Sequence, residues 1–102
     1  MTHILKTWPG EFGAVASGEK THHVRPSDRP FAAGDTVILR EWIPTGTEDL
    51  TIGRFTNRAI AREITHVTPA GAWGLPPGIC VFSTRPLPKS HALSSISSWP
   101  PR

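Results

Sequence analysis

The segment Lys20-Thr21-His22-His23-Val24-Arg25 gathers several side chains that could do chemistry. Threonine and valine favour an extended strand, and the proline that follows pushes Arg25 towards the same geometry. Alternate side chains of a strand share a face, so His23 and Arg25 lie on one face and Lys20 and Val24 on the other. We expect Val24 to face the core and Lys20 to reach around the rim from the start of the strand.

Each polar residue of this segment has a definite chemical capacity. Arg25 presents a planar fork of donors that suits a phosphate or a base edge, and the alternative is an ion pair with Asp28 or Glu41. Lys20 can contact a phosphate or act as a base, or it is simply solvated. His23 can hydrogen-bond to a base, stack on it, or carry a proton. Neighbouring strand histidines point to opposite faces, so we expect no metal site.

Further cations and aromatic side chains extend the list of candidates. Arg29 is expected to pair with Asp28 or Asp35, or to contact a phosphate at the rim, and Lys6 is an additional cation for the ligand. Trp73 lies between glycines in a predicted loop and is the best candidate for an aromatic that faces a ligand. Core positions are expected for Trp8, Trp42 and Cys80, and a solvated face for Arg54, Arg58 and Arg62.

Composition limits the class of protein. The chain has 102 residues, enough for one domain, and carries a net charge of +3. Its isoelectric point of about 9.8 is compatible with a polyanionic partner. One cysteine excludes an intrachain disulfide and a cage of several thiolates around zinc. No leader sequence and no long apolar run are visible, so we expect a cytoplasmic protein with no membrane partner.

Pattern and turn residues predict the elements that position these side chains. Strands are expected over residues 2–8, 20–25, 36–43, 54–67 and 79–83, with a two-turn helix over 9–17. The stretch 54–67 also fits a helix, but its run of β-branched residues near the end favours a strand. The sequence therefore predicts a mainly β (α+β) fold, a small barrel of about five strands with one short helix after the first. The domain spans residues 1–86, and the Ser- and Pro-rich stretch 87–102 is expected to be a flexible tail.

Several short motifs, in order, carry a resemblance to a known family. The motif formed by Gly18, Lys20 and Arg25 resembles the G-x-K-x-x-x-x-R signature of the ASCH superfamily, which has a PUA-like β-barrel fold. Within it the chain is most similar to the DUF3850 branch, over about residues 3–85. The further matching residues are His3, Leu5, Lys6, Phe12, Thr21, Asp28, Arg29, Phe31, Gly34, Asp35, Leu39 and Glu41.

The resemblance implies a site for RNA or a nucleotide in a cleft between barrel and helix, without a cofactor and with a monomer as the default. Some ASCH proteins are similar to amidohydrolases acting on N4-acetylcytidine, which use the motif lysine, a threonine three residues later and a glutamate. Lys20 matches the first, His23 replaces the threonine, and Glu41 or Glu63 would supply the last. That replacement favours binding over catalysis.

Three hypotheses follow from these residues. The first is an RNA- or nucleotide-binding module, and the second is a small hydrolase, either an amidohydrolase or a ribonuclease. The third is an accessory protein of a phage or mobile element that binds a host protein. The first would use Lys6, Lys20, His23, Arg25, Arg29 and Trp73, and the second Lys20, His23 and Glu41.

Overall fold

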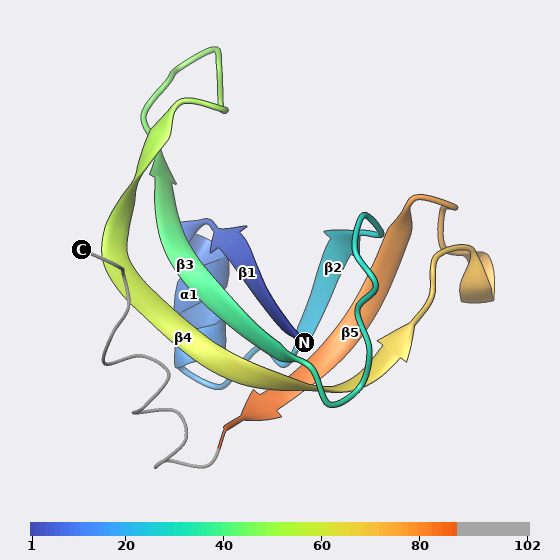
Figure 1. Ribbon diagram of the computed structural model, residues 1–102. Coiled ribbons are helices and arrows are strands. Elements are labelled where there is room, and N and C mark those ends of the chain that lie inside the picture. The colour runs from blue at the N-terminus through green and yellow to red at the C-terminus, as the bar shows by residue number, and fades with distance from the viewer. Residues whose placement is uncertain (88–102) are drawn as a thin grey trace.

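Five strands and one short helix form the domain in the computed structural model, which describes residues 1–87 (Figure 1). The order is β1 (Thr2–Thr7), α1 (Pro9–Ala16), β2 (His22–Pro26), β3 (Thr36–Pro44), β4 (Gly53–Thr68), the short 3₁₀ helix η1 (Ala72–Gly74) and β5 (Ile79–Pro86). The predicted mainly β fold with one helix after the first strand is confirmed, and the ambiguous stretch is a strand. Of the tail predicted over residues 87–102, residues 88–102 lie outside the described residues.

The strands form one sheet in the order β1-β3-β4-β5-β2. β1 runs parallel to β3, and the other neighbours are antiparallel. The sheet curls until its two edge strands, β1 and β2, face each other without pairing, which leaves a half-barrel (Figure 1). We call this opening between the free edges of β1 and β2 the seam.

The long strand β4 makes the curl possible. Its first part pairs with β3 and its second part with β5. The register shifts in both pairings, between Arg40 and Trp42 on β3 and between Ile64 and His66 on β4. Such bulges bend a strand and increase its twist. Asn57 has φ of 71°, a left-handed conformation that asparagine tolerates better than most residues.

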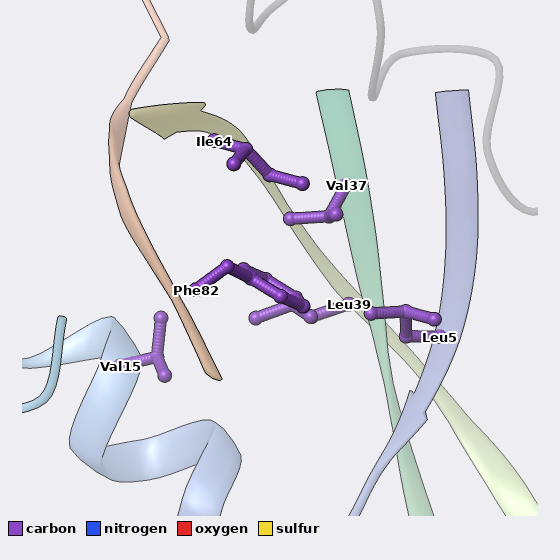
Figure 2. Packing of buried hydrophobic residues seen from close by; sticks show 6 residues of the cluster. All are labelled: Leu5, Val15, Val37, Leu39, Ile64 and Phe82. Carbon is purple, nitrogen blue, oxygen red and sulfur yellow. The ribbon is translucent and has the colours of Figure 1, made fainter. Parts of the chain in front are cut away.

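The core fills the concave side of the half-barrel. Side chains of β1 alternate between exposed and buried, as expected for a strand with one face in the core. Phe82 lies between Val15 of α1 and Leu39 of β3 (Figure 2). The complete cluster is Leu5, Val15, Val37, Leu39, Ile64 and Phe82. Helix α1 thus closes part of the curl and brings its own residues towards the seam.

Several side chains lie elsewhere than the sequence predicted. Val24 is 57% exposed, because the inward face of β2 is taken by His23, which packs on Phe82. Trp8 is half-exposed instead of buried, whereas Trp42 and Cys80 are buried as expected. Arg62 is buried rather than solvated. Strand β4 runs from the open end of the sheet into the curl. Arginines spaced by four along this strand therefore meet different surroundings.

Candidate functional site

Two arginines bridge the seam. Arg25 of β2 donates from Nη1 to the Lys6 carbonyl (3.1 Å) and from Nη2 to Thr7 Oγ1 (3.2 Å). Arg29, in the loop after β2, donates from Nη1 to the Ile4 carbonyl (3.0 Å). These guanidinium groups stand where a backbone ladder would close a complete barrel. The alternative reading of Arg25, an ion pair with Asp28 or Glu41, is wrong.

A pocket of about 320 Å³ lies on the seam between β1, α1 and β2. We call it the Lys20 pocket. It brings together Lys6, Lys20, His23 and Arg25, four of the predicted site residues, and adds three that sequence reasoning missed, Thr7, Trp8 and Glu11. Its volume falls within the range of small-molecule sites, which is about 300–1,000 Å³.

A second pocket of about 160 Å³ adjoins it, and we call it the Arg29 pocket. It shares Lys6, Arg25 and Pro26 with the Lys20 pocket, so these three residues separate the two hollows. Its other walls are Leu5, Asp28, Arg29 and Phe31. Arg29 therefore lies in the hollow next to Arg25, and its ion-pair partner is Asp28 at 3.8 Å. Asp35 is instead bound to His3 at 2.8 Å.

Helix α1 supplies an acidic partner for Lys20. The ammonium of Lys20 forms an ion pair and hydrogen bond with the carboxylate of Glu11. This hydrogen bond lowers the pKa of Glu11 below its ordinary value. The backbone N–H of Lys20 donates to the Ala14 carbonyl (3.1 Å), which ties the start of β2 to the end of the helix. One signal was in the sequence, because Glu11 precedes the buried Val15 by four residues and shares its helical face.

His23 is buried at the back of the Lys20 pocket. Its ring stacks on Phe82 with 5.1 Å between centroids, and its Nε2 is hydrogen-bonded to Thr84 Oγ1 at 3.1 Å. Burial, and to a smaller extent the nearby charges of Arg25, Lys20 and Arg62, together lower the pKa of His23 to about 4. The imidazole is therefore neutral at pH 7.

A buried arginine determines how this imidazole is held. Arg62 donates from Nε to Thr84 Oγ1 and from Nη2 to the Thr84 carbonyl, both at 3.1 Å. If the Thr84 hydroxyl accepts a hydrogen bond from Arg62 Nε and donates its own proton to His23 Nε2, both contacts of this hydroxyl are hydrogen bonds with a donor and an acceptor. The proton of His23 then sits on Nδ1, which has no hydrogen-bond partner among residues 1–87. With this arrangement of protons, Nδ1 of His23, a residue that lines the Lys20 pocket, is a neutral N–H donor.

The charge around the pocket is mostly positive. Arg62 is 5% exposed, and no carboxylate within residues 1–87 forms an ion pair with it. Burial lowers the pKa of Arg62 and of Arg25, yet a guanidinium stays charged at neutral pH. Among the described residues, Glu11 is the one acidic side chain that lines the Lys20 pocket.

Other candidate residues lie outside both pockets. Glu41 is buried on β3, where its carboxylate accepts from Thr56 Oγ1 (2.8 Å) and lies 3.5 Å from Arg58. Glu63 is paired with Arg85 at 2.7 Å. Trp73 is 95% exposed in η1, which Figure 1 places beyond β5 and away from the seam. The geometry thus puts Glu11, not Glu41, beside Lys20, and Trp8, not Trp73, beside the ligand space.

Within residues 1–87, no three histidine, cysteine, aspartate or glutamate side chains come close enough to hold a metal ion. No helix in this part of the chain has the length and apolar character needed to cross a membrane.

The fold and the site define a curled β half-barrel whose unpaired edges enclose a cationic pocket. The family model described as a domain of unknown function, DUF3850, matches residues 2–84, so the chain belongs to the DUF3850 family. It is also similar to an uncharacterized 12.9 kDa protein in the GpA 3' region of Escherichia phage P2, with 35% identity over 71 residues. The match covers 70% of this chain and 58% of the phage protein.

Proposed function

We propose that this chain is a binding module for RNA or a nucleotide, with the Lys20 pocket as its binding site. The observation that carries the proposal is the position of Arg25. Its guanidinium is half-buried in the pocket wall and forms no ion pair with a carboxylate in residues 1–87. Two of its five N–H groups donate hydrogen bonds to β1. The remaining donors form a fork suited to a phosphate or a base edge.

The surroundings of Arg25 support the same ligand. His23 offers a neutral donor for a base, and Trp8 is 44% exposed at the mouth of the pocket, where its ring could stack on a base. Lys20 and the buried Arg62 add positive charge. The ammonium of Lys6 lies 4.2 Å from the Trp42 ring centroid, so Lys6 serves the site mainly through its backbone and its alkyl chain.

The ASCH resemblance supports this proposal as well. Of the motif residues Gly18, Lys20 and Arg25, the last two line the Lys20 pocket. The likeness to a phage P2 protein agrees with a role in phage or mobile-element biology.

Fluorescence anisotropy with labelled single-stranded RNA tests the proposal. We expect affinity to fall as salt rises, and Arg25→Ala to weaken binding about 5- to 100-fold, the range for loss of a charge-assisted contact. Arg25→Lys keeps the charge but loses the fork, so we expect an intermediate affinity. Arg54→Ala is the matched control, because Arg54 is exposed on β4 and lines neither pocket.

Thermal melts of each variant show whether the seam still folds without the Arg25 bridge. Folded Arg25→Ala protein that binds RNA as tightly as the unchanged chain would contradict the proposal. Binding that does not respond to salt would do the same.

A second candidate, a small hydrolase, is favoured by one observation: Lys20, Glu11 and His23 converge in the Lys20 pocket. An ammonium, a carboxylate and an imidazole can move protons in hydrolysis. Incubation with N4-acetylcytidine and with RNA, followed by product analysis, separates the two functions. Turnover that disappears in Lys20→Ala would favour the hydrolase, and unchanged substrates with intact RNA binding would remove it.

A further inference from the structure

The Lys20 pocket and the Arg29 pocket form one track along the seam. Their volumes are about 320 and 160 Å³, and they meet at Lys6, Arg25 and Pro26. A ligand that fills the first pocket and continues past Arg25 along the seam reaches the second. The second pocket has its own cation, Arg29, and an aromatic wall, Phe31. The seam therefore offers two adjacent compartments, each with an arginine in reach.

The donors of both arginines are only partly used. Arg25 spends one N–H on the Lys6 carbonyl and one on Thr7 Oγ1. Arg29 spends one N–H on the Ile4 carbonyl, and its contact with Asp28, at 3.8 Å, is longer than a hydrogen bond. A guanidinium has five N–H donors, so each side chain is positioned by β1 and still has donors for an anion.

The same bonds argue against a peptide as the occupant. A peptide that adds to a sheet edge needs the free carbonyl and N–H groups of that edge. At the seam, the carbonyls of Ile4 and Lys6 already accept hydrogen bonds from Arg29 and Arg25. A strand could pair with β1 here only by displacing both guanidinium groups. An anion, in contrast, can bind the two guanidinium groups without displacing them.

We infer that the seam binds a single nucleic-acid strand of at least two nucleotides, an inference that rests on the proposed function. One base occupies the Lys20 pocket beside Trp8 and His23. The adjoining phosphate lies in the Arg29 pocket, between Arg25 and Arg29, and the next sugar or base packs on Phe31. Asp28 also lines this pocket, and its pairing with Arg29 competes with the phosphate.

Calorimetric titration with a series of cytidine and uridine ligands tests the inference: the nucleoside, which has no phosphate, the dinucleotide with its one internucleotide phosphate, and a hexanucleotide. We expect the dinucleotide to bind about tenfold more tightly than the nucleoside, the gain from one charge-assisted contact. Arg29→Ala removes most of this gain and weakens nucleoside binding much less than dinucleotide binding, because the nucleoside carries no phosphate. Asp28→Asn frees Arg29, so dinucleotide affinity rises several-fold. Arg54→Ala serves again as the control and alters neither affinity.

The outcomes separate this inference from the function on which it rests. Equal affinity for nucleoside and dinucleotide overturns the inference and leaves the proposed function standing. An Arg29→Ala variant, folded by thermal melt, that weakens both ligands equally also overturns it. Failure of every nucleotide to bind the unchanged chain overturns the proposed function and the inference together.

Discussion

The buried polar triplet of His23, Thr84 and Arg62 is the most unusual feature at the scale of single residues. A charge inside a small domain costs free energy unless its hydrogen bonds are satisfied. Arg62 meets this need through two hydrogen bonds to Thr84 instead of an ion pair with a carboxylate. Its charge therefore stays uncompensated and acts on the neighbouring imidazole. A donor site for an acceptor atom of a ligand is a direct use for such an arrangement.

The depressed pKa of His23 predicts how stability depends on pH. His23 has a pKa of about 4 in the folded protein, and a histidine in the unfolded chain has about 6.5. Between these values the unfolded chain binds more protons, so the free energy of unfolding falls as pH falls. The contribution of the neutral His23 imidazole to the free energy of unfolding is complete above about pH 6.5. Lowering the pH from 7.5 to 5 should cost about 2 kcal/mol through this group, measured by denaturant unfolding.

Paired variants isolate the contribution of this imidazole. His23→Gln removes the titrating ring and keeps a group able to bond to Thr84, so its stability should depend less on pH over the same range. His22→Gln changes an exposed histidine on the same strand and should keep the full dependence. A dependence that is the same in both variants would show that His23 titrates normally. The range stops at pH 5 because Asp35 and Glu11, whose pKa values are lowered, lose their contributions in more acidic solution.

Among the elements, the hairpin of β3 and β4 has a close backbone approach at Gly53. Gly53 lies against the Trp42 ring, and an added Cβ would sit 2.3 Å from Trp42 Cζ2 and 2.4 Å from the Ile43 carbonyl oxygen. A backbone oxygen cannot move aside cheaply. Trp42 in turn holds the ammonium of Lys6, so this contact links the hairpin to β1 and the seam.

We expect Gly53→Ala to lower the free energy of unfolding by about 1–3 kcal/mol, as overpacking of a close contact does. Gly78→Ala is the matched control, because no atom lies within 4 Å of its Cβ position, and it should change stability by less than about 0.5 kcal/mol. Urea unfolding of both variants measures the difference. Equal stabilities would show that the hairpin can open at Trp42 without cost.

At the scale of the whole molecule, one small core holds the half-barrel closed. Phe82 is 1% exposed and contacts both the core and the site, since it packs on Phe31 and stacks on His23. A domain of this size has a net stability of about 5–15 kcal/mol, so one large core residue accounts for much of it.

Phe82→Ala should therefore lower the free energy of unfolding by about 3–5 kcal/mol. Phe55→Ala provides the comparison, because Phe55 is 40% exposed and packs under Arg40, a contact of about 1 kcal/mol. Chemical denaturation measures both. A small effect at Phe82 would mean that β2 and β5 do not depend on this core, and that the seam can move without unfolding the domain.

The sequence by itself was enough to predict the local elements. β-branched runs, the proline at the start of α1 and the glycine after the helix indicated the strands and the helix, and strand alternation put His23 and Arg25 on one face. These signals are local because they arise from neighbouring side chains and backbone angles.

Only the tertiary structure decided which face points inward and which residues meet. His23 lies over Phe82 because β2 pairs with β5, and its partner Thr84 is 61 positions away. The same pairing turns Val24 outward, while the curl buries Arg62 and brings Glu11 to Lys20. An edge strand has no local signal for its inward face when both faces carry mixed side chains, so long-range pairing and burial settle it.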